Sequence, residues 1–282
     1  MTKNSGGLYV VATPIGNLKD MTPRAVEILS RADLIAAEDT RHSAKLLQHF
    51  RVTTKMISLH EHNERDKAAE LIEFMRQGGV LALISDAGTP LISDPGFNLV
   101  RAAHAAGITV TPIPGACAAI AALSAAGLPP DRFMFAGFPP AKSPARRAFF
   151  EQCQREPRTL IFYESPHRVK ECLADMLAVF GSERQVVFAR ELTKQFETIR
   201  AGMLAELHDW VAGDENQQRG EIVILLHGRE QKEDQAIDAE AERVLRILLA
   251  ELPVKQAAAL AAQITGLKKN QLYQYALGLA ED

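Results

Sequence analysis

Two loops rich in glycine and proline hold the residues best suited to bind a ligand. Residues 13–16 (TPIG) follow the first apolar run of the chain, and residues 85–96 (SDAGTPLISDPG) follow a later one. The second loop contains two glycines, two prolines and two aspartates in twelve positions. Loops of that length between a strand and a helix are more often functional than short ones. Because open α/β sheets bind ligands at the carboxyl ends of their strands, both loops predict a binding site there.

Four more polar segments follow apolar runs and contain groups that could transfer protons. Residues 33–41 read DLIAAEDTR, residues 60–64 read HEHNE, residues 159–168 read TLIFYESPHR and residues 190–194 read RELTK. Imidazoles and carboxylates in such places can act as general acids or bases. Simpler roles stay open, because Asp39 can also cap a helix. The two histidines of HEHNE could bind a metal, but no further ligand follows at a recognisable spacing.

Composition and charge exclude several classes of protein. The chain has 282 residues, of which 47% are apolar and 24% charged, as is typical of a globular protein. Its net charge of −3 excludes a histone-like polycation. The absence of a GxxxxGK[ST] motif excludes a P-loop NTPase, and the absence of GxGxxG disfavours a Rossmann dinucleotide site.

The cysteine content and the hydropathy of the chain indicate the cellular compartment. Cys117, Cys153 and Cys172 are odd in number and widely spaced, so we expect neither a disulfide framework nor a cysteine zinc site. No apolar stretch is long enough for a signal-peptide core or a membrane span. We therefore expect a cytoplasmic protein with no membrane partner.

Short apolar runs with amphipathic segments between them predict alternating strands and helices, and hence an α/β fold. The predicted strands are residues 8–13, 34–38, 55–59, 80–85, 108–112, 133–137, 159–164, 185–191, 198–201 and 221–227. The predicted helices include residues 23–31, 64–77, 96–106, 116–126 and 166–180.

The predicted strands fall into two groups of five, which indicates two α/β lobes followed by a helical tail. We place the N-terminal lobe at residues 1–117, the C-terminal lobe at 118–228 and the tail at 235–282. The tail has predicted helices at residues 237–251, 254–265 and 268–279, and the last two resemble a helix-turn-helix.

The charge of the tail argues against the reading of DNA. Residues 229–282 hold seven Lys and Arg against nine Asp and Glu, whereas helix-turn-helix proteins that read DNA are usually basic. We therefore favour a helical packing module, and a DNA-binding regulator stays an alternative.

One segment is locally basic. Residues 138–170 hold seven Lys and Arg against three Glu, a charge of +4 within a chain of −3, and Phe149 and Phe150 lie inside it. Cations interleaved with aromatic side chains can hold a nucleic-acid backbone and stack bases. A solvated helix face explains the same pattern equally well.

In order along the chain, these segments resemble one family. TPIGNL, DLIAAEDTR, HEHNE, SDAGTPLISDPG, PIPGA, FYESPHR, RELTK and RGE are similar to the signature series of the bacterial 16S rRNA (cytidine-2′-O)-methyltransferases, within the tetrapyrrole-methylase superfamily. The resemblance covers roughly residues 8–228. It implies two α/β lobes of the tetrapyrrole-methylase type, with S-adenosylmethionine bound in the cleft between them, and a homodimer.

The same resemblance implies which residues hold the cofactor. The first loop would be Thr13, Pro14, Ile15 and Gly16, and the second Asp86, Ala87, Gly88, Thr89, Pro90 and Ser93. Pro114, Gly115 and Ala116 would lie near the lobe junction. Backbone near Phe162, Tyr163, Leu192, Gly220, Glu221 and Ile222 would hold the adenine. No metal is implied.

The implied reaction is methyl transfer to the ribose 2′-oxygen of a cytidine in the decoding centre of 16S rRNA, with the assembled small subunit as the expected partner. Because a 2′-hydroxyl is a weak acid, a base or a cation should assist its deprotonation. The unranked catalytic candidates are Asp39, His60, Glu64 and Lys194. The expected RNA contacts are Arg41, His62, Arg146, Arg147 and Arg168. A tetrapyrrole C-methyltransferase and a metal-dependent hydrolase stay as alternative enzymes.

Overall fold

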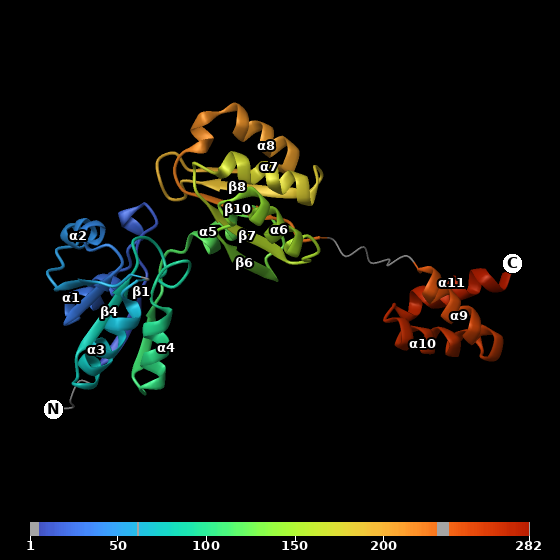
Figure 1. Ribbon diagram of the computed structural model, residues 1–282, viewed down its shortest axis with the longest axis horizontal. Coiled ribbons are helices and arrows are strands. Elements are labelled where there is room, and N and C mark those ends of the chain that lie inside the picture. The colour runs from blue at the N-terminus through green and yellow to red at the C-terminus, as the bar shows by residue number, and fades with distance from the viewer. Residues whose placement is uncertain (1–5, 61, 230–236, 282) are drawn as a thin grey trace. The chain divides into compact units, whose positions relative to one another are not determined.

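The computed structural model describes residues 6–60, 62–229 and 237–281, and the chain divides into two compact units, Met1–Gly228 and Arg229–Asp282 (Figure 1). The first unit contains two five-stranded sheets. The elements of the second unit, within its described residues, are all helices. The predicted α/β class is therefore confirmed. The domain bounds proposed from the sequence remain predictions.

The first sheet is fully parallel and has the strand order β3-β2-β4-β1-β5. Its strands are β1 (Gly7–Val11), β2 (Leu34–Ala37), β3 (Met56–Ser58), β4 (Val80–Ile84) and β5 (Thr109–Ile113). Most of their apolar side chains are buried, as expected of strands that are covered on both faces.

Helices cover both faces of this sheet. α1 (Pro23–Arg31) and α2 (Thr40–His49) pack on one face, whereas α3 (Glu64–Arg76) and α4 (Phe97–Ala105) pack on the other. The chain thus leaves the neighbouring strands β1 and β4 toward opposite faces. Adjacent strands with diverging connections open a crevice at their carboxyl ends, where α/β proteins bind ligands.

The second sheet is mixed and has the order β6-β7-β10-β8-β9. Its strands are β6 (Phe133–Gly137), β7 (Thr159–Glu164), β8 (Gln185–Arg190), β9 (Thr198–Met203) and β10 (Ile222–Leu226). Only β6 and β7 run parallel. The alanine-rich α5 (Ala118–Ala126) covers one face, and α6 (Ser143–Cys153), α7 (Val169–Phe180) and α8 (Leu204–Gly213) cover the other.

The second unit is a three-helix cluster. α9 (Ala239–Glu251), α10 (Val254–Thr265) and α11 (Lys269–Glu281) pack around Leu245 and Leu272 together with small alanines. α10 ends at Gly266, which has a φ of +72° and allows the turn into α11. The three predicted tail helices are thus confirmed.

All ten predicted strands form, and their ends shift by at most two residues. Helices α2, α6 and α8 were not among the helices named from the sequence.

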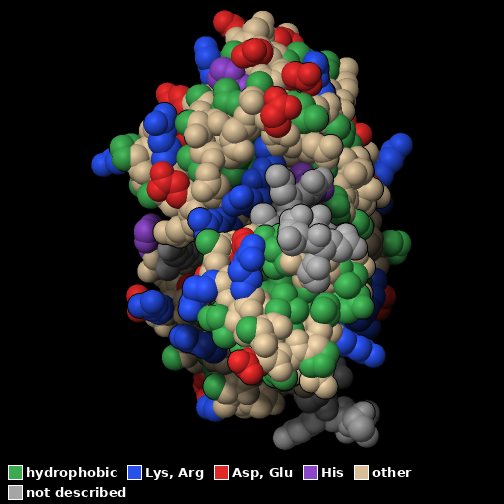
Figure 2. All heavy atoms as spheres, turned by 90° about the vertical axis from the view of Figure 1, so that its right-hand side faces the viewer, with side chains coloured by type: hydrophobic (Ala, Val, Ile, Leu, Met, Phe, Trp, Pro, Cys, Tyr) green, Lys and Arg blue, Asp and Glu red, His purple; other side chains and the backbone are tan. Residues whose placement is uncertain are grey.

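On the face that Figure 2 shows, basic side chains are interspersed with hydrophobic and acidic ones. The net charge of −3 is therefore an average over both signs.

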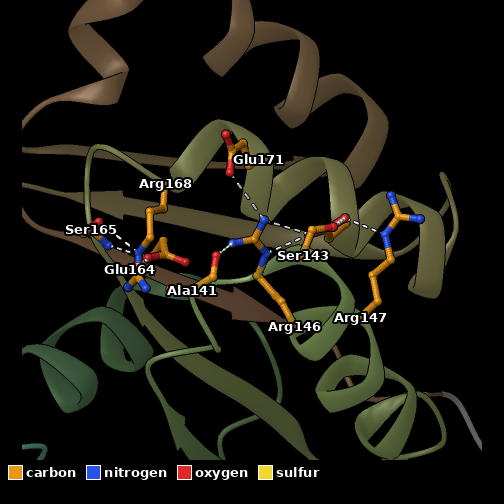
Figure 3. A network of polar contacts seen from close by, with 9 residues as sticks. Ala141, Ser143, Arg146, Arg147, Glu164, Ser165, Arg168 and Glu171 are labelled. Carbon is orange, nitrogen blue, oxygen red and sulfur yellow. Dashed lines mark hydrogen bonds and ion pairs between the residues drawn. The ribbon is translucent and has the colours of Figure 1, made fainter.

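A buried ion-pair network joins α6 to α7 (Figure 3). The side chain of Arg146 is 0% exposed, and its Nε donates to Asp175 Oδ2 over 2.8 Å. Arg146 also donates to the carbonyl of Ala141, while Arg147 and Ser143 donate to Asp175 Oδ1. The predicted RNA contact at Arg146 is therefore wrong, because the guanidinium is enclosed and committed to Asp175.

Asp175→Asn should destabilise the protein, because it leaves the buried Arg146 charge with only the exposed Glu171, 3.7 Å away. Removing one partner of a buried pair costs about 3–5 kcal/mol. Urea denaturation of the purified variant would measure this loss. Glu171→Gln is the matched control, and it should cost under about 1 kcal/mol, because the Glu171 carboxylate is exposed and Arg146 keeps its close contact with Asp175. Equal effects of the two substitutions would contradict the assignment.

Candidate functional site

The two glycine- and proline-rich loops are joined to each other at the carboxyl edge of the first sheet. Thr13 and Gly88 form an isolated antiparallel bridge, with N–H to O distances of 2.8 and 3.1 Å. Two further contacts extend this junction: Thr89 Oγ1 donates to the carbonyl of Ala116, and the backbone N–H of Asp39 donates to Asp86 Oδ1. These contacts hold the loops that follow β1, β2, β4 and β5 together at the carboxyl edge of the first sheet.

The second loop has an unusual backbone. Gly88 and Gly96 have φ values of +81° and +127°, which glycine tolerates. Leu91 and Ser93 have φ values of +72° and +70°, where a side chain is strained. Such positions cost about 1–3 kcal/mol each and cluster at functional sites. The shape of this loop is therefore maintained against local preference.

A cavity of about 400 Å³ lies between this loop and the second sheet. Its apolar lining includes Ile92, Phe138 and Val223. Several residues predicted to bind the cofactor line it, namely Ile15, Asp86, Ala87, Gly88, Thr89, Ser93, Tyr163, Glu221 and Ile222. Other predicted cofactor residues line neither this cavity nor the one beside it: Thr13, Pro90, Pro114, Gly115, Ala116, Phe162, Leu192 and Gly220.

Five carboxylates line this cavity: Glu38, Asp86, Asp94, Glu164 and Glu221. Glu164 is paired with Arg168 and Glu221 with Lys194, which leaves Glu38, Asp86 and Asp94 as the carboxylates without a cation beside them among the described residues. Burial, with the charges of Glu38 and Asp86, raises the pKa of Asp94 to about 6, although a hydrogen bond with Ser85 opposes the shift. Burial and the charge of Asp86 likewise raise the pKa of Glu38. The mutual repulsion of these groups favours a cationic ligand among them.

Tyr163 fixes the far wall of the cavity. Its hydroxyl oxygen accepts a hydrogen bond from the backbone N–H of Ala119 over 3.0 Å, at the start of α5. Its ring makes edge contacts with Phe135 and Phe138, at centroid distances of 4.9 and 5.6 Å. Burial, together with the neighbouring Cys117, raises the pKa of Tyr163, so the phenol stays neutral. Phe138, which is exposed, lines the cavity beside Tyr163.

A second cavity, of about 350 Å³, adjoins the first. The two share Ile15, Asp86, Ala87 and Glu221, so these four residues form a common wall. Pro14 and Gly16, both predicted to bind the cofactor, line the second cavity instead of the first. Its other lining residues include Leu18, Leu46, His42, Lys45 and Lys194.

Lys194 connects the second lobe to the first loop. A Cβ added at Gly16 would overlap the Lys194 side chain, so the lysine stem lies directly over this glycine. Its Nζ donates to Glu191 Oε1 over 2.8 Å and to Glu221 Oε2 over 3.1 Å. Burial lowers the pKa of Lys194, but these hydrogen bonds outweigh it and leave the pKa raised. Lys194 therefore acts as a fixed cation and not as a base.

The other catalytic candidates lie outside both cavities. Asp39 caps α2, and its hydrogen bonds with Arg41 lower its pKa to about 2, which makes it a weak base. Glu64 is 3% exposed and accepts hydrogen bonds from the backbone of Leu99 and the side chain of Asn98. The carboxylate is enclosed at the start of α4, and its catalytic role stays a prediction.

His60 is half-buried in the loop after β3. Its Nε2 lies 3.2 Å from Asn63 Nδ2, whereas its buried Nδ1 has no hydrogen-bond partner among the described atoms. His60 lines neither cavity. The structure therefore does not bring it to the common wall.

The four remaining RNA-contact candidates are accessible to different degrees. Arg41 is almost fully exposed and pairs with Asp39, and His62 is exposed. Arg147 is half-exposed at the edge of the Asp175 network. Arg168 is 28% exposed and pairs with the buried Glu164 over 2.8 Å (Figure 3). Because Glu164 and Ser165 line the first cavity, Arg168 also supports that wall.

Five functional candidates were not named from the sequence: Glu38, His42, Lys45, Asp94 and Phe138. Glu38 and Asp94 lie inside motifs that were singled out, so the signal was present. His42 and Lys45 lie on α2, where charged residues ordinarily indicate a solvated face.

Among the residues that the structure describes, which do not include Glu61, no group of three or more His, Cys, Asp or Glu residues is placed to hold a metal ion. No described helix is both long and apolar enough to cross a membrane.

Comparison with known proteins identifies the family. Residues 7–208 match the model of the tetrapyrrole (corrin/porphyrin) methylases, and residues 235–280 match that of the RsmI C-terminal HTH domain. A protein of Pseudomonas aeruginosa named ribosomal RNA small subunit methyltransferase I is 62% identical, over 97% of this chain and 98% of its own. The protein of that name from Escherichia coli O157:H7 is 56% identical, over 97% and 96%.

The chain belongs to the ribosomal RNA small subunit methyltransferase I family. The resemblance seen in the motifs is thus confirmed. Solved structures show the same fold for its first unit. The methyltransferase CobJ superposes with a TM-score of 0.59 at 20% identity, over 80% of this chain and 95% of the other.

A second solved structure shows this fold with a ligand. Uroporphyrin-III C-methyltransferase from Thermus thermophilus, described as complexed with S-adenyl homocysteine, has a TM-score of 0.53 at 18% identity, over 79% and 97%. At such identities the likeness shows the fold alone.

Asp94→Asn should stabilise the protein in the absence of ligand, and more so at high pH. The pKa of Asp94 rises from 3.8 to about 6 on folding, so its charge opposes folding progressively as the pH rises through that interval. Thermal melts at pH 8 should show a higher midpoint for the variant, and the difference should shrink toward pH 5. Asp131→Asn, in an exposed loop, is the control. A pH-independent difference would contradict the burial of this charge.

Proposed function

We propose that this protein transfers a methyl group from S-adenosylmethionine to the ribose 2′-oxygen of a cytidine in the decoding centre of 16S rRNA. The observation that carries the proposal is the pair of adjoining cavities with a common wall that includes Asp86 and Glu221: the first is lined by carboxylates, and the second also by Lys45, Lys194 and His42. Relatives named ribosomal RNA small subunit methyltransferase I, 62% and 56% identical, support a ribosomal RNA substrate.

The first cavity fits the donor by its chemistry. S-adenosylmethionine carries a sulfonium and an ammonium charge, which Glu38, Asp86 and Asp94 complement. Ile92 and Phe138 offer apolar contact to the adenine, and the strained Gly88 loop brings backbone groups close to the ligand. When bound, this cofactor supplies an electrophilic methyl group and leaves as a neutral thioether.

The common wall is where the acceptor oxygen must lie. The C–O bond forms as the C–S bond breaks, and the 2′-hydroxyl loses one proton. Lys194, held protonated beside Glu221, stabilises the negative charge that develops on the oxygen. The proton passes to a carboxylate of the wall, Asp86 or Glu221. Positioning of the oxygen against the methyl carbon supplies much of the remaining rate.

The proposal extends to the biological setting. We propose the assembled small ribosomal subunit as the substrate, a homodimer as the active form and the cytoplasm as the location. The sequence motifs support these three statements through the family that they resemble. Analytical ultracentrifugation at micromolar concentration should give the mass of two chains, and a monomer would contradict the dimer.

Methyl labelling tests the reaction directly. Purified protein with labelled S-adenosylmethionine should label the 16S rRNA of small subunits from a strain that lacks this activity, and digestion should recover the label on a cytidine ribose. Uroporphyrinogen III should remain unlabelled in a parallel reaction. Label on a base, on the tetrapyrrole or nowhere would overturn the proposal.

Substitution of Lys194 separates its catalytic role from cofactor binding. Lys194→Gln should lower kcat by about 100-fold, in the range for loss of one group that stabilises transition-state charge. The Kd for S-adenosylmethionine, measured by calorimetry, should stay close to that of the parent. Lys194→Arg keeps the charge and should restore part of the rate. A normal kcat in Lys194→Gln would rule out the role.

A further inference from the structure

The second cavity contains two basic side chains that belong to α2. Lys45 and His42 are exposed on α2, and among the residues that the structure describes neither side chain has a hydrogen-bond or ion-pair partner. Lys194, in contrast, is held by two carboxylates. We infer that this cavity holds the target nucleotide and that Lys45 and His42 bind a phosphodiester beside it. The inference rests on the proposed function.

Helix geometry places both side chains on one face. His42, Lys45 and Leu46 are three and four residues apart, which puts them side by side on a helix, and all three line the cavity. Ser43 and Leu47, also four apart, are buried on the other side of α2 against the sheet. The burial of Leu47 therefore fixes which face of α2 points at the cavity.

The charges in the two cavities orient an RNA strand. Glu38 and Asp94 line the donor cavity but not the second one, and they repel a phosphate from the donor cavity, so the anion lies on the α2 side. The carboxylates of Asp86 and Glu221 in the common wall can accept hydrogen bonds from ribose hydroxyls. A strand with its phosphate at Lys45 thus directs its ribose toward the wall and the methyl donor.

The shape of the cavity selects the form of the RNA. A volume of about 350 Å³ suits one nucleotide and cannot enclose a base-paired duplex. Leu18, which is 41% exposed, and Leu46 provide apolar contact to a base or ribose face. We expect a nucleotide that is splayed out of its stack, as in other enzymes that modify nucleotides.

Charge reversal at Lys45 tests this site. Lys45→Glu should raise the KM for small ribosomal subunits about tenfold. It should also lower the slope of log KM against log salt concentration by the amount expected for the loss of about one phosphate contact. The Kd for S-adenosylmethionine should be unchanged, which shows that the variant is folded. His42→Ala should weaken RNA binding in the same direction by a smaller amount.

Lys55→Glu is the matched control. Lys55 is an exposed lysine in the same lobe, but it precedes β3 and so lies at the opposite edge of the sheet. If Lys45→Glu and Lys55→Glu have the same KM and the same salt dependence of KM, Lys45 does not bind a phosphate and the inference is overturned.

Filter binding of small ribosomal subunits distinguishes this failure from failure of the proposed function. If the parent binds the subunits but makes no 2′-O-methyl product, the reaction is wrong, and the salt slopes of binding still decide the role of Lys45. If the parent binds no subunits, both are overturned.

Discussion

The two hydrogen bonds between Thr13 and Gly88 are the contact on which the site depends. The chain leaves β1 and β4 toward opposite faces of the sheet, so their loops would otherwise diverge. The bridge holds them together at the carboxyl edge, and the strained backbone at Leu91 and Ser93 then shapes the rest of the wall. Both cavities include residues of these two loops, which explains why one loop cannot move without altering both.

The charge arrangement follows from this framework. Carboxylates from the loop after β2 and from the Gly88 loop meet in the first cavity, where burial and their mutual repulsion raise the pKa of Asp94 and of Glu38. Lys194 reaches over Gly16 from the second lobe and carries a compensated positive charge to the common wall. A cationic methyl donor can therefore bind in the first cavity while an anionic RNA strand binds in the second.

The positions of the strands and of the loops that follow them could be predicted from the sequence, because apolar runs indicate strands and clusters of glycine and proline indicate loops. The sequence did not separate Arg146 from Arg147, since adjacent arginines look alike in a sequence, and only the packing of α6 on α7 buries Arg146 and leaves Arg147 half-exposed, with both paired to Asp175. It likewise missed His42 and Lys45, because a helix face that lines a cavity has the same composition as one that faces water. Burial of Glu64 depends on α4, 35 residues away at Leu99, which no local pattern encodes.

The most direct test of the central claim is a structure of the protein with S-adenosylhomocysteine and a short single-stranded RNA that contains the target cytidine. We expect the sulfur among Glu38, Asp86 and Asp94, the ribose 2′-oxygen at the common wall of Asp86 and Glu221 beside Lys194, and a phosphate at Lys45. A nucleotide bound outside the second cavity, or a cofactor bound outside the first, would contradict this arrangement.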